Sequence, residues 1–444
     1  MSQADQAAVC RWVEEQLGGK IVACERQARW RPAYFLELDN NGVRSALYFR
    51  GDRGVSDSAQ YALEHEMTCL QVLEAGGIPV PHVFGFCDEP RGILMERSPG
   101  RADLSTAVDL AEERAVQRHY MEILARIHSL DIDPFLQAGL DAPAEPKHLA
   151  LADLPLWEKG YRNAKTRPQP LIEFALQWLK RNVPKPSASA CFVCGDSGQF
   201  LFEEGRVTAV LDLELAHLGD PAEDLGALRS RDLSEPLGDL RLAIADYEEF
   251  SGRHVDPFLI DFHTVRFSLT TPLATLPVLA KARPGVDLIQ YLCWFHVYSR
   301  APMEVIAHSR GIDLEPPDLP DSEENRHSPI FEDLSLRLKP TSGEAGFDDY
   351  AQQTAHRTAV YLERLNRYGA ALSADDLADI NALLGSRHAE AEDAEAALEA
   401  WILEADAGAD ADLVRLLHRR CLREAVLLEP VLAEFSGARI QLLD

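Results

Sequence analysis

The pattern of apolar and polar positions predicts a mixture of strands and helix in the first hundred residues. An Asn-Asn-Gly at 40–42 separates two β-prone runs and is typical of a hairpin, because Asn and Gly tolerate positive φ. A helix is predicted from residue 59 to residue 75, where two glycines at 76–77 end it. Four short runs are predicted strands: 33–39, 43–50, 83–87 and 93–96.

Helical periodicity takes over after residue 98. Between residues 112 and 130, apolar side chains recur at helical spacing and predict one buried helix face. A second helix is expected at 171–182, and most of 223–310 has helical character. Residues 191–212 interrupt this pattern, because they contain short strand-like runs, a turn and a hairpin.

The last part of the chain changes composition twice. Residues 311–345 are rich in Pro, Ser and acidic residues, which predicts a linker or a wrapping arm. Helical character returns at Phe347, and Ser-Ala-Asp-Asp at 373–376 matches a capping box that predicts the start of a helix. We therefore expect three parts: a small α/β lobe at 1–97, a mostly helical lobe at 98–335 and a helical bundle at 345–444.

Charge and hydropathy restrict the partners. The chain has 444 residues and a formal net charge of −28, from 44 Lys and Arg against 72 Asp and Glu. Such an acidic chain is repelled by phosphate backbones and anionic lipids, so we expect neither a nucleic acid nor a membrane as partner. The N-terminus lacks the apolar core of a signal peptide. The most apolar stretch, 267–280, contains two prolines and is shorter than the about 20 residues that cross a bilayer, so a cytoplasmic protein is expected.

Eight cysteines are scattered along the chain, which is typical of reduced thiols rather than of a disulfide framework. Cys191 and Cys194 form a C-x-x-C, but no second ligand pair at similar spacing accompanies them. We interpret them as two unrelated buried thiols.

Two carboxylates stand where chemistry is expected. Asp196 precedes a short predicted hairpin, and Asp212 ends the strand with which that hairpin returns. Acidic groups at neighbouring strand ends suit a base for a hydroxyl group beside a ligand of a divalent metal. Carboxylates in this position also occur in enzymes of unrelated chemistry, so the spacing alone leaves the function open.

The motifs around these carboxylates resemble a known family. The chain has Cys194-Gly195-Asp196, then Leu-Asp-Leu-Glu at 211–214, then Gly-Asp-Pro-Ala-Glu-Asp-Leu at 219–225. This series resembles the aminoglycoside phosphotransferase-like branch of the protein-kinase fold, and the last block is the most specific match. The resemblance covers residues 15–310. It implies an α+β, two-lobed protein-kinase-like fold to which a C-terminal helical segment is added.

The resemblance implies ATP and Mg²⁺ as cofactors and a role for each matching residue. Asp196 is implied to orient the acceptor hydroxyl, and Asp212 to hold Mg²⁺ on the β- and γ-phosphates. Arg50 is expected over the α- and β-phosphates, in an ion pair with Glu66. The backbone of three hinge residues is expected to read adenine: Met95, Glu96 and Arg97.

Three features depart from the family pattern. Cys194 stands where the family has His, which removes that side chain's orienting hydrogen bonds. The loop after Asp196 is shorter than in the family, and Gln199 is nearest the expected Asn, so we take it as the second metal ligand. A Gly-rich phosphate loop is missing from 25–40, where three arginines stand between residues 26 and 33.

Several structural alternatives stay open on the sequence alone. Arg50 and Glu66 also fit a simple surface ion pair. Asp220, Asp224 and His128 are expected to be structural rather than catalytic. Two arginines, Arg229 and Arg231, fit either a contact with an anionic substrate or a solvated helix end.

Two functions follow. The first is an ATP-dependent phosphotransferase acting on a hydroxyl of a small molecule, with hydroxyacyl thioesters favoured over antibiotics as acceptors. The alternative is a catalytically impaired pseudokinase that serves as a binding or scaffolding module, which Cys194 and the short loop favour. A protein partner or a homo-oligomer contact, if formed, is expected at the C-terminal helices.

Overall fold

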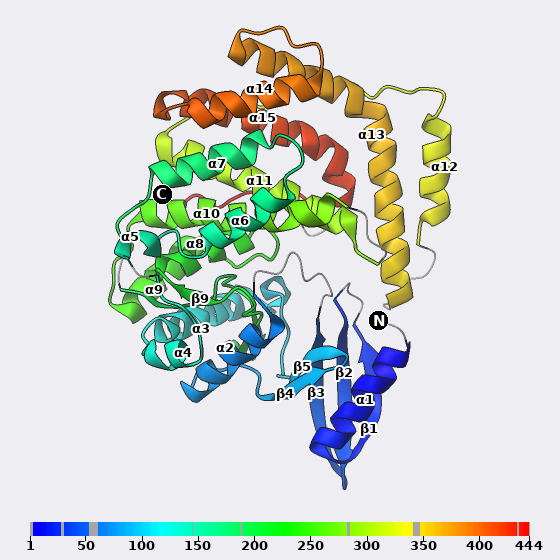
Figure 1. Cartoon of the computed structure of the whole chain (residues 1–444). Coiled ribbons are helices and arrows are strands. Elements are labelled where there is room, and N and C mark those ends of the chain that lie inside the picture. Colours follow the sequence, from blue (N-terminus) through cyan, green and yellow to red (C-terminus); the bar gives the residue numbers. More distant parts are fainter. Residues whose placement is uncertain are drawn as a thin grey trace.

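The structure is a computed structural model and has two lobes with further helices packed on the larger one (Figure 1). A sheet lobe comes first, a mostly helical lobe follows, and the C-terminal helices pack on the far side and along one flank of the helical lobe. This confirms the predicted α+β, two-lobed protein-kinase-like fold with an added C-terminal helical segment. The structure describes residues 3–27, 31–52, 61–143, 145–186, 189–281, 285–340, 347–432 and 435–443.

An antiparallel sheet in the order β1-β2-β3-β5-β4 forms the small lobe. Its core joins Val9 and Val13 of α1 to Leu36, Leu47 and Phe49 of the sheet. The sequence predicted four of the five strands but neither α1 nor β1. The elements are α1 (Gln3–Leu17), β1 (Lys20–Arg26), β2 (Ala33–Asn40), β3 (Val43–Gly51), α2 (Leu63–Ala75), β4 (Val83–Asp88) and β5 (Arg91–Glu96).

Helix α2 begins at Leu63, later than the predicted start at residue 59. Residues 59 and 60 lie outside the described part of the chain. The helix packs against β4 and β5 and buries Glu66, which is 2% exposed. This packing carries an acidic side chain to the inner face of the sheet, beside Arg50 of β3.

The large lobe is helical except for two small two-stranded sheets. These are the hairpin β7–β8 and the pair β6–β9, and the chain between their strands forms the loops at 194–199 and 211–216. The elements are α3 (Leu110–Ile127), α4 (Asp133–Gln137), α5 (Pro146–Leu149), α6 (Leu154–Ala164), α7 (Pro170–Arg181), β6 (Cys191–Val193), β7 (Phe200–Glu203), β8 (Arg206–Val210), β9 (His217–Gly219), α8 (Ala222–Arg231), α9 (Leu240–Ser251), α10 (Pro257–Leu279) and α11 (Leu288–Arg310).

The C-terminal helices correct one prediction and add detail to another. The segment at 311–345, expected to be a linker or a wrapping arm, contains a helix, α12, which packs along α13 and places Ser335 against His356. The capping box does not start a helix, because Ser373 lies inside α13, where tertiary packing overrides the local signal. The elements are α12 (Ser328–Leu338), α13 (Phe347–Leu384), α14 (Ala391–Glu404) and α15 (Asp410–Leu428), with short 3₁₀ turns at Leu104–Thr106, Ala407–Ala409 and Glu429–Val431.

One continuous apolar core joins the C-terminal helices to the large lobe. Ile380 of α13 and Leu413 of α15 belong to the same buried cluster as Trp178, Phe262 and Val297. An ion pair adds to this docking, since Lys165 Nζ lies 2.7 Å from Glu399 Oε1 of α14. Helices α13–α15 therefore share one apolar core with the large lobe.

Residues near the end of the chain return to the helices of the large lobe. The carbonyl of Gln441 accepts a hydrogen bond from Arg229 Nε at 2.7 Å. The side-chain amide nitrogen of Gln441 donates to Asp232 Oδ2 and to the carbonyl of Gly238, each at 2.8 Å. These bonds tie the segment to the end of α8. None of the helices in the described ranges is both long and apolar enough to span a bilayer.

Candidate active site

The loop at 194–199 is held in place by a buried carboxylate. Asp224, in the first turn of α8 and 0% exposed, accepts the backbone N–H of Cys194 at 2.8 Å and of Gly195 at 3.0 Å. His128 Nε2 lies 3.0 Å from the same carboxylate. Gly195 has φ +77°, and a Cβ there would meet the carbonyl oxygen of Leu215 at 2.2 Å, so the position requires glycine. Two backbone N–H groups of the loop are therefore anchored on Asp224.

Asp196 leaves this anchored loop and meets an arginine. Arg231, in the last turn of α8, donates through Nε to Asp196 Oδ1 at 3.1 Å and through Nη2 to Oδ2. The amide nitrogen of Gln199 donates to Asp196 Oδ2 at 2.9 Å. Burial raises the pKa of Asp196 to about 6, although Arg231 acts in the opposite direction. A carboxylate with a pKa close to neutrality suits general-base chemistry.

Arg50 of the small lobe binds three carboxylates, of which Asp212 and Glu214 belong to the large lobe. Its Nε donates to Glu66 Oε2 at 2.8 Å, and its Nη2 bonds to Asp212 and lies 3.2 Å from Glu214 Oε2. Arg50 is 5% exposed and Glu66 is 2% exposed, so this ion pair is internal and not on the surface. Burial raises the pKa of Glu66 to about 7, which Arg50 opposes. Asp212 follows β8 and has φ +58°, a left-handed conformation uncommon for Asp.

A second arginine reaches the same group of carboxylates. Arg31 is 4% exposed and pairs with Glu214. No role was predicted from the sequence for Glu214, and Arg31 was noted among the three arginines that stand in place of the Gly-rich loop. The signal for Glu214 was its place two residues after Asp212 in the matching motif, whereas nothing local distinguished Arg31. Residues 28–30, in the segment where the Gly-rich loop is missing, lie outside the described residues.

The oxygen donors of this group fit Mg²⁺. Glu66, Asp212 and Glu214 each offer a carboxylate oxygen, and the three oxygens lie within 4.8 Å of one another. A hard cation such as Mg²⁺ prefers oxygen ligands of this kind. Arg31 and Arg50 balance most of the negative charge at the same place. The amide nitrogen of Gln199 is directed to the base rather than to this group, and its role as second metal ligand stays a prediction.

The hinge residues lie at the end of β5, which is an inner strand of the small-lobe sheet between β3 and β4. The backbone N–H of Glu96 donates to the carbonyl of His82 at 2.8 Å, and that of Arg97 donates to the carbonyl of Ala46 at 3.1 Å. Both N–H groups are therefore used within the sheet. Recognition of adenine by Met95, Glu96 and Arg97 stays a prediction. Since these two N–H groups are already bonded, a backbone carbonyl of this segment is the group expected to accept a hydrogen bond from adenine.

A second group of titratable side chains is an ion-pair network. Arg266 donates to Glu223 and Asp153, and His217 Nε2 lies 3.0 Å from Glu223 Oε1. Burial opposes the charged imidazolium, but Glu223 and Asp153 more than offset this and raise the pKa of His217 to about 9. Burial likewise raises the pKa of Glu223, but Arg266 and His217 lower it to about 2. Since a guanidinium already supplies the positive charge, we interpret this network as structural.

The contacts of Asp220, Arg229 and the cysteines bear on the structural alternatives that the sequence left open. Asp220 accepts the backbone N–H of Ala222 at 2.9 Å at the start of α8. Arg229 is 1% exposed and pairs with Asp261 at 2.5 Å, so it does not lie at a solvated helix end. None of the eight cysteines forms a disulfide, and Cys191 and Cys194 are both buried.

Comparison with known proteins gives one family and several partial relatives. The model of the phosphotransferase enzyme family matches residues 27–258, which is more than half of the chain. Acyl-CoA dehydrogenase family member 10 of Mus musculus is 29% identical over 206 residues, or 44% of this chain and 19% of that protein. Acyl-CoA dehydrogenase family member 11 of Rattus norvegicus is 29% identical over 215 residues, or 46% of this chain and 27% of that protein.

The matched segment thus spans less than a third of the length of either curated relative. Among solved structures, a macrolide 2′-phosphotransferase from Brachybacterium faecium superposes with a TM-score of 0.46 and 21% sequence identity. That superposition covers 61% of this chain and 91% of the other.

Proposed function

Because the chain belongs to the phosphotransferase enzyme family, we propose that it transfers the γ-phosphoryl group of ATP to a hydroxyl group of a small molecule. The observation that carries this proposal is the meeting of Arg50, Glu66, Asp212 and Glu214 within reach of a loop that presents Asp196. Phosphoryl transfer needs positioning and charge neutralisation more than covalent help from the protein.

Each group has a distinct task in this proposal. Asp212 and Glu214 would hold Mg²⁺, which when bound neutralises charge on the phosphates. Arg50 and Arg31 would bind phosphate oxygens, since a guanidinium donates several N–H groups to such anions. Glu66 keeps Arg50 in position by accepting its Nε–H.

Asp196 orients the acceptor hydroxyl and takes its proton as the new bond to phosphorus forms. Arg231 donates one hydrogen bond to each of the two carboxylate oxygens and so fixes the orientation of the base. Asp224 anchors the loop by accepting the backbone N–H groups of Cys194 and Gly195, and these bonds do not require a histidine at position 194. This anchoring supports an active enzyme despite the missing histidine.

We further propose a hydroxyacyl thioester as the acceptor. This proposal is supported by the names of the curated relatives, acyl-CoA dehydrogenase family members 10 and 11. The acidic composition would also suit a cationic aminoglycoside, so both classes belong in the acceptor screen.

A pseudokinase is the second candidate, favoured by the pairing of Asp212 and Glu214 with arginines of the chain itself. Thermal-shift titration with ATP, with and without Mg²⁺, tests nucleotide binding directly, since a ligand of the native state raises the melting temperature. Binding without phosphorylation of any hydroxyl compound would favour the pseudokinase.

The catalytic test uses two variants and one control. Asp212→Asn should abolish Mg²⁺-dependent transfer, and Asp196→Ala should lower kcat about 10²–10⁴-fold with ATP binding unchanged. Glu203→Gln, an exposed carboxylate in the β7–β8 hairpin, should behave like the unmodified protein. Full activity of either active-site variant on the true acceptor would exclude the assigned role.

A further inference from the structure

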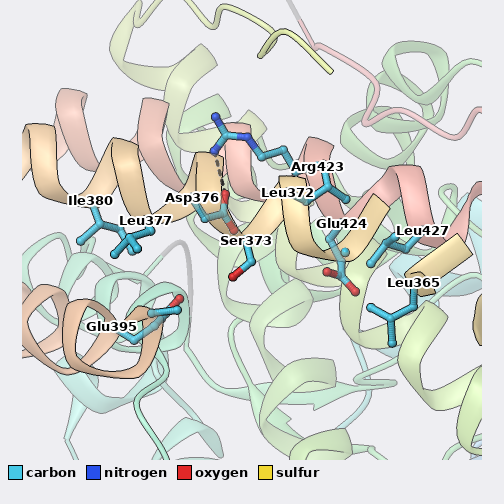
Figure 2. A pocket seen from close by; sticks show the side chains of 12 residues that line it. Leu365, Leu372, Ser373, Asp376, Leu377, Ile380, Glu395, Arg423, Glu424 and Leu427 are labelled. Carbon is cyan, nitrogen blue, oxygen red and sulfur yellow. Dashed lines mark hydrogen bonds and ion pairs between the residues drawn. The ribbon is translucent and has the colours of Figure 1, made fainter. Parts of the chain in front are cut away.

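Two adjoining cavities lie among the C-terminal helices, apart from the carboxylates around Arg50. The larger has a volume of about 220 Å³ and lies between the start of α7, α11 and α15. The smaller, of about 180 Å³, lies between α13, α14 and α15 (Figure 2). Both are larger than the about 150 Å³ in which an engineered protein cavity binds benzene. Asp376, Glu395 and Glu424 line both cavities and form their common wall.

The larger cavity contains two buried polar side chains that lack partners. His296 is 3% exposed and Ser299 is 4% exposed, and neither His296 Nε2 nor Ser299 Oγ has a hydrogen-bond partner among the described residues. The two lie three residues apart on α11, so they share one face of the helix. Buried polar groups are normally hydrogen-bonded, and an unsatisfied pair in a cavity indicates a ligand or ordered water.

The common wall carries one carboxylate more than its arginines neutralise. Asp376 is bound by Arg423 at 2.7 Å, an ion pair drawn in Figure 2, and Glu395 is bound by Arg420. Glu424 makes no hydrogen bond or ion pair with any residue that the structure describes. Burial raises its pKa and the neighbouring Asp376 acts in the same direction, whereas Arg420, already paired with Glu395, opposes them.

These features select the chemistry of a ligand. An anion is disfavoured, because Arg420 and Arg423 are already paired and Glu424 would repel it. A small metal ion is disfavoured too, since the groups of converging metal-ligating atoms in the described ranges lie elsewhere in the chain. Apolar side chains complete the larger cavity, among them Leu171, Leu292 and Phe295, and would cover a hydrocarbon body.

We propose that the two cavities form a binding site for a small organic ammonium ion. The ammonium group donates to Glu424 and to the acceptors that lack a partner, His296 Nε2 and Ser299 Oγ, and the hydrocarbon body packs on Phe295. Because the lining comes from α7, α11 and α13–α15, an occupied site would hold the C-terminal helices more firmly on the large lobe.

Isothermal titration of the full chain with butylamine and phenethylamine, both protonated at neutral pH, tests the proposal. We expect saturable binding and a rise in melting temperature for at least one amine. Glu424→Gln should weaken binding about tenfold or more, because it removes the charged partner. Ser299→Ala, which keeps Glu424, should weaken binding less. Glu429→Gln, at an exposed position just after α15, is the matched control and should bind as the unmodified chain does.

Three results would overturn the proposal. The first is no binding of either amine at millimolar concentration, which would leave the cavities to ordered water. The second is equal binding by Glu424→Gln. The third is binding of butanoate or 1-butanol as tight as that of butylamine, since the charge assignment would then be wrong.

Discussion

Replacement of Asp224 by Asn tests how the catalytic loop is held. The Asp224 carboxylate is buried and accepts two backbone N–H groups, from Cys194 and Gly195, at 2.8 and 3.0 Å. Asn has nearly the same shape but only one oxygen. One of the two backbone N–H groups would therefore face an NH₂ group and lose its acceptor.

The size of the effect follows from these contacts. Hydrogen bonds to charged groups contribute about 1.5–3 kcal/mol each, and a buried donor without a partner costs about 1–3 kcal/mol. We expect Asp224→Asn to destabilise the closed loop by about 3 kcal/mol, which corresponds to about a hundredfold larger open population. Activity should fall as well, because the loop carries Asp196.

Hydrogen–deuterium exchange of peptides covering 191–199 measures this population. We expect exchange about a hundredfold faster in Asp224→Asn, with peptides of the small lobe unchanged. Asp109→Asn is the matched control: Asp109 also accepts two backbone N–H groups, each at 2.9 Å, but it lies on the surface at the start of α3. Asn and Asp are nearly equivalent at exposed helix starts. Unchanged exchange in a folded Asp224→Asn protein would refute the reasoning.

Three further predictions concern stability and docking. Glu223 raises the pKa of His217 from its ordinary 6.5 to about 9. The stabilisation by the charged imidazolium is therefore complete below pH 6.5 and is lost as the pH rises through 9. The denaturation midpoint should fall over this interval, and it should fall less in His217→Gln. Glu399→Gln should loosen α14 by about 1 kcal/mol, since its ion pair with Lys165 is partly buried, and limited proteolysis of 385–410 would detect this. Gly195→Ala should abolish transfer with the fold kept, because a Cβ there would lie 2.2 Å from a backbone oxygen; an unchanged kcat in this variant would contradict the close approach of residue 195 to Leu215.

The parts of the fold predicted correctly are those with strong local signals. The hairpin between β2 and β3 follows from Asn and Gly at the turn, and α3 follows from one apolar face. Local signals failed where tertiary packing decides. Ser373 has the neighbours of a helix start, yet Leu372 and Ile380 are buried on either side of it, and a continuous α13 buries both.

The candidate site divides in the same way. Asp196 and Asp212 could be located because their motif is short and continuous in sequence. Their partners could not, because the contacts join distant segments: Arg231 is 35 residues from Asp196, and Arg31 is 183 residues from Glu214. No periodicity or spacing encodes such a contact, which depends on how α8 and the sheet lobe pack around the loops.

The return of Gln441 to α8 has a consequence for the order of events during synthesis. Arg229 and its partner Gln441 are 212 residues apart, and the bonds to Asp232 and Gly238 need the same late segment. At about 5–20 residues per second, the ribosome delivers that segment about 10–40 s after Arg229. The end of α8, which carries the partner of Asp196, thus lacks these hydrogen bonds until residue 441 has been translated, so water must satisfy the same polar groups during this interval.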